Sequence, residues 1–349
     1  MSWIKSTSVV SLITILLFVV IEIIFRTVYT KDIIQNDPEL MRAIYGDRVD
    51  QAYEMFEAQG FGQMYVPFVE YVERPRYTPF VTVMSSGNRC HYRPIDKCEV
   101  NGGEDEIWVI GGSTTFGYSV ADSETISAYL SDFYDDKIVH NFGAASYYST
   151  QENYRLLELL KIYNPPGLVV FIDGLNDVAN FQFPDKTMAS DGIQRRVEGS
   201  YFYNSFLFAA RGIVEQSELL KFLVLKEQEY REFEISNEQI SAILKRFNFN
   251  IQLREAIKNT FNINVVTVLQ PVPQKGDYEK SSIPIRFSRA DGLIEHTNTI
   301  YEELKDGSTS HSVVDLTTIS FNGARYVDSV HYTPEFNLHI AKEIFEKLK

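Results

Sequence analysis

The chain has 349 residues, 47 of them acidic and 33 basic, which gives a formal net charge of −14 at neutral pH. Hydrophobic residues make up 44% of the chain and aromatic residues 13%, enough for a sizeable core, so the composition excludes a mainly disordered protein. The acidic balance argues against nucleic-acid binding, because phosphate contacts need a basic surface. With only 2 cysteines, a disulfide-rich scaffold and a zinc site built from cysteines alone are excluded.

The N-terminal segment is predicted to be a membrane anchor. Residues 9–28 are mostly apolar, and Glu22 is the only charged residue up to Phe25. A helix of about 18–20 residues crosses the hydrocarbon core of a bilayer. A cleaved signal peptide and a buried core helix are the alternatives, but the apolar run is longer than that of a signal peptide and no A-x-A-like cleavage site follows it. We therefore predict a transmembrane helix within residues 1–30, although the basic residues on its two sides do not decide its orientation.

Residues 31–104 are predicted to form a juxtamembrane helix and a β-rich accessory segment. The first part is polar with helically spaced apolar positions, and residues 65–69 and 80–83 have the composition of short strands. Cys90 and Cys98 lie close together between candidate loops, and in an oxidising compartment such a pair can close a small disulfide loop. A pair of free thiols is the alternative. The cysteines give weak support to a catalytic domain outside the cytoplasm, in a periplasm or at a cell surface, which we favour.

From residue 105 to residue 349, apolar runs alternate with helical patterns. Predicted strands cover residues 107–110, 137–142, 168–172, 263–269 and 313–316, and predicted helices cover 123–134, 150–163, 237–261 and 334–348. Apolar strands that alternate with helices indicate a parallel sheet covered on both faces, so we predict an α/β fold with three α/β/α layers. An insertion at about 180–236 interrupts the alternation, and three interpretations stay open for it: packing helices, a lid or acyl-binding cap, and a membrane-surface patch.

Reactive groups in such a sheet lie at the carboxyl ends of the strands, and the first predicted strand ends in Gly111-Gly112-Ser113. Glycines at a strand-to-helix turn permit close backbone approach. A serine at the head of the following helix, near backbone N–H groups, suits a nucleophile whose attack creates an oxyanion. A phosphate-binding turn is the alternative, but the run has neither the P-loop nor the dinucleotide spacing, and it is not the G-x-S-x-G elbow.

Three further strand ends or loops carry candidate groups. Gly143 follows the second strand, in a run of small residues that lets a backbone N–H face a cleft, although most such runs are merely tight turns. Asn176 follows the third strand, and its amide is a neutral donor suited to a developing oxyanion; an Asx-turn or helix cap is the alternative. Asp328 and His331 precede the last helix, where the carboxylate can fix the tautomer of a general base, with a solvated loop pair as the alternative.

In combination, these four motifs resemble the SGNH/GDSL hydrolase family over about residues 105–349. The resemblance implies a flavodoxin-like α/β/α fold, no metal and no cofactor. It also implies a Ser113–His331–Asp328 triad and an oxyanion hole formed by the N–H groups of Ser113 and Gly143 with the Asn176 amide. One departure is that the first block reads Gly111-Gly112-Ser113 rather than GDS, which removes a carboxylate beside the nucleophile.

The expected function is that of a serine esterase or acylhydrolase that forms an acyl-enzyme on O-acyl groups of a cell-envelope glycan or lipid. Two alternatives stay open: an O-acyltransferase that modifies an envelope polysaccharide, and a non-catalytic, membrane-tethered glycan-binding or assembly protein. The expected partners are an acylated carbohydrate or lipid substrate and a membrane, without nucleic acid. The sequence does not indicate the oligomeric state.

Overall fold

A computed structural model describes residues 17, 18, 20, 21, 38–58, 62–179, 236–273, 297–304, 313–328 and 330–349. The chain divides into two compact units, one formed by residues 1–36 and 189–232 and the other by residues 37–188 and 233–349. The second unit contains both the accessory segment and the alternating strands and helices. The predicted insertion and most of the predicted anchor fall outside the described residues. Within the described parts of the chain, no helix combines the length and the apolar character needed to cross a membrane.

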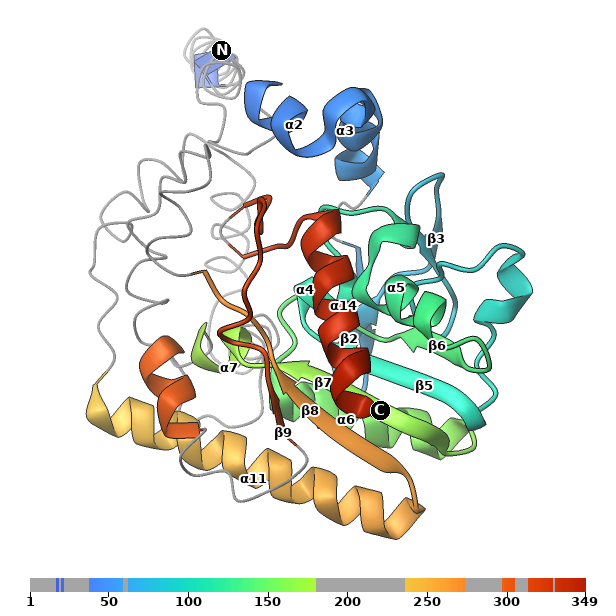
Figure 1. The fold of residues 1–349 in the computed structure, drawn as a ribbon, viewed down its shortest axis with the longest axis vertical. Helices are drawn as coiled ribbons and strands as arrows, with labels where there is room; N and C mark the ends of the chain where they lie inside the picture. Colours follow the sequence, from blue (N-terminus) through green and yellow to red (C-terminus); the bar gives the residue numbers. More distant parts are fainter. Residues whose placement is uncertain are drawn as a thin grey trace, which may run out of the picture. The chain divides into compact units, whose positions relative to one another are not determined.

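A parallel sheet of five strands forms the centre of the second unit, in the order β6-β5-β7-β8-β9 (Figure 1). The strands are β5 (Gly103–Gly111), β6 (Ile138–Asn141), β7 (Pro166–Asp173), β8 (Asn264–Leu269) and β9 (Val313–Asp315). Both faces of the sheet are covered, which explains why the strands read as continuous apolar runs rather than as an alternating pattern. The predicted parallel sheet is confirmed.

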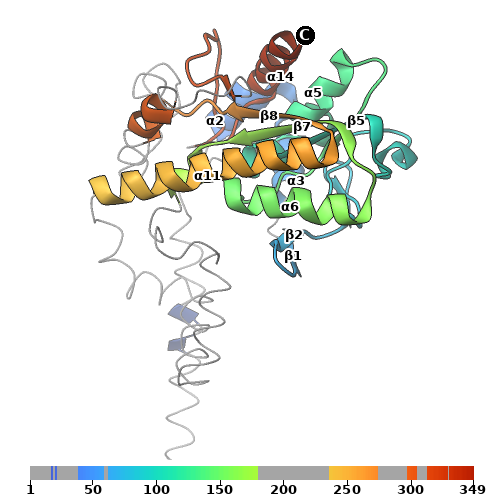
Figure 2. The same ribbon diagram turned by 90° about the horizontal axis from the view of Figure 1, so that it is seen from below.

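Helices cover the two faces of the sheet in separate layers (Figure 2). One layer holds α5 (Ile126–Phe133) and α14 (Pro334–Leu348), and the other holds α6 (Ser149–Ile162) and α11 (Asn237–Phe261). Successive side chains of a strand point to opposite faces, so Ile107 and Val109 pack in the core of the first layer, while Trp108 and Ile110 pack in the core of the second. This arrangement confirms the predicted α/β/α layers.

Two examples show how predicted elements differ in detail from the structure. The predicted helix 123–134 is divided into η4 (Asp122–Glu124) and α5, because Thr125 has extended backbone angles and its hydroxyl caps α5 by accepting from the N–H of Ala128. The predicted strand 65–69 ends early, at Val66, and the chain turns at residues 67–69 before it reverses into the next strand.

The accessory segment consists of helices and short antiparallel strands. Its helices are α2 (Pro38–Tyr45), η2 (Gly46–Arg48) and α3 (Val49–Ala58), and its strands are the pairs β1 (Gln63–Val66) with β2 (Glu70–Glu73) and β3 (Arg76–Tyr77) with β4 (Thr82–Val83). Isolated bridges join Val83 to Arg89 and Arg89 to Asn141 at the end of β6. The β3–β4 pair therefore continues from the β6 edge of the main sheet, whereas β1 and β2 form a separate pair.

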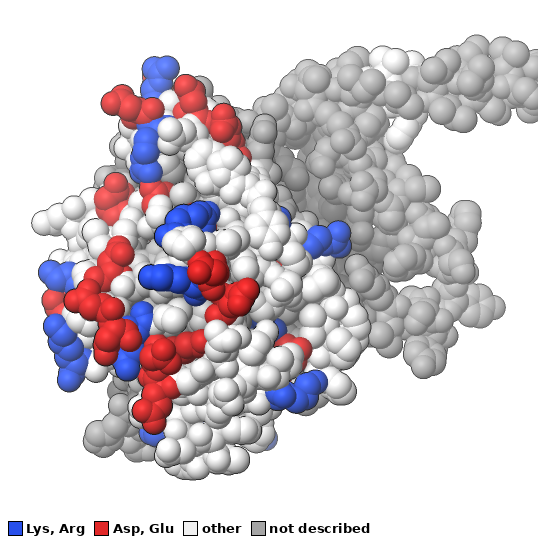
Figure 3. Space-filling model, turned by 90° about the vertical axis from the view of Figure 1, so that its right-hand side faces the viewer, with Lys and Arg blue, Asp and Glu red and all other residues white. Residues whose placement is uncertain are grey.

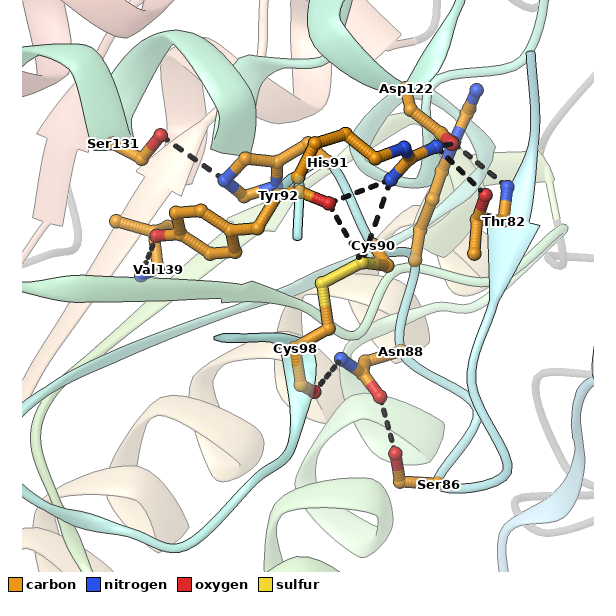
Figure 4. Close-up of a disulfide and its surroundings, with 12 residues drawn as sticks. Thr82, Ser86, Asn88, Cys90, His91, Tyr92, Cys98, Asp122, Ser131 and Val139 are labelled. Atoms are coloured by element: carbon orange, nitrogen blue, oxygen red, sulfur yellow. Dashed lines mark hydrogen bonds and ion pairs between the residues drawn. A yellow bond between two sulfur atoms is a disulfide. The ribbon is translucent and has the colours of Figure 1, made fainter. Parts of the chain in front are cut away.

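A disulfide joins Cys90 and Cys98, whose Cα atoms lie 5.5 Å apart (Figure 4). Both cysteines are buried, and the side chain of Asn88 donates to the carbonyl of Cys98 at 3.0 Å. The bond closes the loop that follows Arg89 and includes η3 (Ile95–Cys98).

On the face of the molecule that carries α5, β3 and β6, acidic and basic side chains interleave with uncharged surface (Figure 3).

Candidate active site

The candidate site lies where the sheet order changes direction. The chain leaves β5 toward β6 on one side, whereas β7 is followed by β8 on the other side. In open α/β sheets, ligands bind beyond the carboxyl ends of the strands at such a switch point. Ser113 follows β5 and Asn176 follows β7, so the two predicted groups come from the strand pair at the switch point.

Ser113 is the first residue of the short helix α4 (Ser113–Phe116), directly after the turn at Gly111-Gly112. A Cβ atom on Gly111 would lie 2.1 Å from Oγ1 of Thr115, and one on Gly112 would lie 2.5 Å from Nδ2 of Asn176. The two glycines therefore allow the nucleophile turn to pack closely against its neighbours. The first N–H groups of a helix have no acceptor within the helix, so the N–H of Ser113 is available to a bound group.

The side chains of Ser113, His331 and Asp328 form a continuous hydrogen-bonded chain. Nε2 of His331 lies 2.9 Å from Oγ of Ser113, and Nδ1 of His331 lies 2.6 Å from Oδ2 of Asp328. The other carboxylate oxygen, Oδ1, accepts the backbone N–H groups of Val330 at 2.9 Å and His331 at 2.8 Å. The sequence prediction had grouped these three residues, and the structure brings all three together, although His331 follows Ser113 by more than two hundred residues.

The environment of Asp328 favours its charged form. Burial by itself raises the pKa of this carboxyl, but the charge of His331, the ring hydrogen bond and the two backbone N–H donors outweigh burial, so the pKa lies below its usual value. Asp328 is therefore ionised at neutral pH and can hold the Nδ1–H of His331. With Nδ1 held in this way, Nε2 is the ring nitrogen of His331 that faces Oγ of Ser113 and can accept a proton.

Asn176 lies on α7 (Leu175–Ala179), next to Gly112. Its Nδ2 atom donates to the carbonyl of Tyr147 at 2.7 Å, which orients the amide beside the nucleophile turn. Gly174, two residues before Asn176, has a φ of 132°, and a Cβ atom there would lie 1.8 Å from the hydroxyl of Tyr301. Only glycine fits this turn, so Gly174 sets the path by which the chain reaches Asn176.

Gly143 lies in a different environment from the one predicted. It is buried, and its N–H donates to Oδ1 of Asn141 at 3.0 Å. A Cβ atom on Gly143 would lie 2.3 Å from the backbone nitrogen of Phe116, so glycine is needed here for contact with α4. Asn141 is the cause of this difference in environment. Its amide also donates to the carbonyl of Thr115 at 2.8 Å and so joins this loop to α4. The N–H of Gly143 is thus engaged inside the fold rather than directed to a substrate.

Ser146 is the residue of this loop that the sequence did not single out. The neighbouring N–H groups all have acceptors: Ala144 donates to Gly111 O at 3.0 Å, Ala145 to Oε1 of Glu73 at 3.2 Å, and Tyr147 to Ala144 O at 3.3 Å. Among the described residues, the N–H of Ser146 has none, and Ser146 is exposed with a left-handed φ of 62°. That backbone angle is uncommon for a residue other than glycine, and no local sequence pattern indicates it.

A buried arginine of the accessory segment supports the nucleophile helix. The five N–H groups of Arg89 have five acceptors, four of them backbone carbonyls. The acceptors are Oδ1 of Asp122 (2.9 Å) and the carbonyl oxygens of Phe116 (3.0 Å), Gly117 (2.6 Å), Phe80 (3.3 Å) and Val120 (2.7 Å). Because Phe116 ends α4, Arg89 binds the carbonyl end of the helix that begins at Ser113.

A second buried arginine, Arg254 of α11, lies beneath the Asn176 turn. Its acceptors are all side chains: both oxygens of Asp173, Oε2 of Glu152 at 3.1 Å, Oδ1 of Asn153 at 2.8 Å and Oγ1 of Thr267 at 2.9 Å. Burial, together with the nearby Asp173 carboxylate, raises the pKa of Glu152 well above its usual value. Asp177, next to Asn176, accepts from the backbone and the hydroxyl of Ser149 at 3.1 and 2.5 Å, which ties α7 to the start of α6.

Comparison with known proteins gives similarity in solved structures only, since no protein-family model and no curated protein matches the chain. A lipolytic protein of the G-D-S-L family from Veillonella parvula is 14% identical with a TM-score of 0.39, covering 69% of this chain and 96% of its own. An acetyl xylan esterase is 15% identical with a TM-score of 0.39, and the match covers 70% of this chain and 100% of the esterase. A carbohydrate acetylesterase family member from Sinorhizobium meliloti is 14% identical with a TM-score of 0.35, covering 70% and 97%.

At identities and TM-scores this low, the similarities assign neither a reaction nor a substrate to the chain.

Proposed function

We propose that the protein is a serine esterase that transfers the acyl group of an ester to Ser113 and then to water. The observation that carries the proposal is the hydrogen-bonded chain from Ser113 through His331 to Asp328 at the carboxyl ends of the strands. A serine hydroxyl is a weak nucleophile by itself, and an adjacent base that is oriented by a third group activates it. The geometry therefore supports acyl transfer better than binding alone.

In the first half of the proposed reaction, Oγ of Ser113 attacks the ester carbonyl while Nε2 of His331 accepts the hydroxyl proton. The negative charge moves to the carbonyl oxygen, and Asp328 stabilises the imidazolium. The intermediate then collapses, the bond to the alcohol oxygen breaks, and His331 returns its proton to the leaving alcohol. In the second half, water attacks the acyl-serine by the same steps and releases the acid.

Three N–H groups support the assignment of an oxyanion site: those of the Ser113 backbone, the Ser146 backbone and the Asn176 amide. The Ser146 donor replaces Gly143 in this proposal, because the N–H of Gly143 is held by Asn141. Donors that are already oriented stabilise a developing charge without reorganisation, and removal of one such donor costs about 10²–10³ in kcat. Asn176→Ala should therefore lower kcat by roughly that factor.

The substrate class that we propose is an O-acyl group on a carbohydrate or lipid of the cell envelope. The disulfide between Cys90 and Cys98 supports a site outside the cytoplasm, since such bonds persist in oxidising compartments. The apolar segment at residues 9–28 supports attachment to a membrane. Protease digestion of intact cells or spheroplasts tests this location, and complete protection of the C-terminal residues until the membrane is lysed would contradict it.

The test of the reaction uses the full-length protein in a mild detergent, with a fluorophosphonate probe and 4-nitrophenyl acetate. Ser113→Ala should abolish labelling, because the phosphorus forms its bond to Oγ of the serine as fluoride leaves. The matched control is Ser127→Ala, which removes a buried hydroxyl of α5 that has no hydrogen-bond partner among the residues the structure describes. Equal labelling of wild type and Ser113→Ala, or no labelling of folded wild type, would contradict the proposed function.

A further inference from the structure

Glu73 is a buried carboxylate of the accessory segment that contacts the loop and the aromatic ring beside the candidate catalytic residues. It lies at the end of β2 and is 0% exposed. Oε1 of Glu73 accepts the backbone N–H of Ala145 and the hydroxyl of Tyr118, each at 3.2 Å. Oε2 accepts from the guanidinium of Arg76 at 3.2 Å. One carboxylate thus joins three segments that are far apart in the sequence.

The first contact fixes the loop that carries Ser146. Ala145 precedes Ser146, and its carbonyl also accepts the hydroxyl of Tyr71 at 2.8 Å, so β2 holds both polar backbone groups of this residue. On the other side of Ser146, the hydroxyl of Tyr147 donates to the carbonyl of Tyr71. The N–H of Ser146 therefore lies between two residues that β2 holds in place.

The second contact fixes a ring that lies against the general base. The ring of Tyr118 is centred 5.7 Å from that of His331, with 40° between the ring planes. The backbone N–H of Tyr118 donates to the carbonyl of Ser113 at 3.1 Å. Burial and the nearby charge of Glu73 raise the pKa of the Tyr118 phenol above its ordinary value, so the hydroxyl stays protonated and donates to Glu73.

We propose that Glu73 is a positioning residue. Its one carboxylate fixes the position of the Ser146 N–H, which is the proposed oxyanion donor, and the position of the Tyr118 ring that contacts His331. This inference rests on the proposed esterase function. A buried carboxylate is costly unless it is paired and hydrogen-bonded, and here the three donors come from the loop, the ring and Arg76. A shared carboxylate makes the two positions depend on each other, because a shift of one donor displaces the acceptor of the other.

The alternative is that Glu73 only stabilises the fold, and the kinetic constants distinguish the two. In Glu73→Gln, the amide has one acceptor oxygen where the carboxylate had two, so either Arg76 or the Ala145–Tyr118 pair loses its acceptor. Displacement of catalytic groups by about 1 Å can cost about 100-fold in rate. We expect kcat for 4-nitrophenyl acetate to fall on the order of 10- to 100-fold, with KM changed by less than about threefold.

The matched control is Glu106→Gln, which removes a carboxylate that is 3% exposed and lies toward the amino end of β5. Glu106 accepts from Nε1 of Trp108 at 2.8 Å and from the N–H of Asn101 at 3.0 Å, and its Oε1 lies 3.4 Å from Nε2 of His140. None of these three residues belongs to the candidate site. This variant should lose stability in denaturant but keep kcat within about twofold of wild type. Tyr118→Phe keeps the ring and removes one donor, so its kcat should lie between those of wild type and Glu73→Gln.

All variants are full-length proteins, and their urea midpoints and fluorophosphonate labelling rates are measured beside the kinetic constants. A parallel fall in kcat and labelling rate in folded Glu73→Gln, absent from Glu106→Gln, supports the positioning role. Wild-type kcat in folded Glu73→Gln overturns it, as does an equal fall in kcat in Glu106→Gln at a similar midpoint. If wild type itself neither labels nor turns over substrate, the proposed function fails, which is a separate outcome.

Discussion

Two fully buried arginines flank the candidate catalytic residues, and their partners differ in kind. Arg89 of the accessory segment binds one carboxylate and four backbone carbonyls, whereas Arg254 of α11 binds side chains only, among them Asp173 and Glu152. Burial lowers the pKa of Arg89 despite Asp122, but the carboxylates around Arg254 outweigh burial and raise its pKa. One arginine thus holds backbone in place, and the other neutralises buried acids.

The comparison explains how the site is held from two sides. Carbonyl groups at a helix end have no partner within the helix, and Arg89 supplies donors to those of α4, so it fixes the segment that carries Ser113. Arg254 instead stabilises the acids beneath the Asn176 turn. We therefore expect changes on the accessory side to act on the backbone of the nucleophile helix, and changes on the sheet side to act through charge.

Arg89→Met should have the largest effect on stability. The substitution leaves Asp122, which also pairs with Arg93, without its buried partner, and it leaves four carbonyls without the Arg89 donors. Removal of one partner of a buried ion pair costs about 3–5 kcal/mol. Urea unfolding of the full-length protein measures the loss. The double variant Arg89→Met/Asp122→Asn should recover part of it, because the uncompensated charge is removed. A loss below about 1 kcal/mol would show that the buried arginine is dispensable.

Gly112→Ala should lower activity more than it lowers stability. The backbone angles of Gly112, φ −78° and ψ −158°, are open to any residue, but a Cβ atom would lie 2.5 Å from Nδ2 of Asn176. The amide at the end of a side chain can move aside, so the fold is kept while one oxyanion donor is displaced. We expect kcat to fall by about 10²-fold, as for removal of a single donor, while the urea midpoint changes little.

Steady-state kinetics on Gly112→Ala, with Asn176→Ala beside it, provide the check. If both variants act through the same amide, the double variant should be no slower than Asn176→Ala alone, since effects of groups that act as a unit do not add. Additive losses would show that Gly112 acts through another group. A strong fall in stability would mean that the new Cβ atom displaces the backbone rather than the Asn176 amide.

Glu152→Gln should have the smallest effect. Because burial raises the pKa of Glu152, the carboxyl is more protonated in the folded protein than in the unfolded chain. Such a group lowers stability as pH rises from the usual glutamate value toward the raised value. Glutamine has nearly the shape of the protonated acid, so we expect a change below about 1 kcal/mol near the lower end of this window and a weaker decline of stability with rising pH.

Urea midpoints of wild type and Glu152→Gln over that pH window test the sign. The wild type should decline more steeply than the variant as pH increases. Asp177, whose pKa is also raised by burial, remains in both proteins, so a residual slope is expected. Identical slopes in the two proteins would mean that Glu152 is ionised in the folded state and that the positive charge of Arg254 balances its negative charge.

The parts of the site that the sequence predicted lie in short motifs at strand ends. Ser113, Asn176, Asp328 and His331 could be found because small residues at a turn, a neutral amide and a carboxylate near an imidazole are local chemical signals. Gly143 and Ser146 show where this reasoning stops. A run of small residues indicates a tight loop, but which N–H in the loop lacks an acceptor depends on the side-chain orientation of Asn141 and on Gly111 and Glu73, which come from other segments.

The sequence by itself determined the layers and the strand ends, because the apolar periodicity of each strand and helix is a local property that burial on one or both faces requires. The tertiary structure decided the supporting contacts. Nothing near Glu73 or Arg89 in the sequence indicates that either is buried or what it binds, since the acceptors and donors of both come from segments brought together only by folding. Hydrogen bonds of buried polar groups must be satisfied wherever the fold brings a partner, and that partner is set by the packed structure rather than by the neighbouring residues.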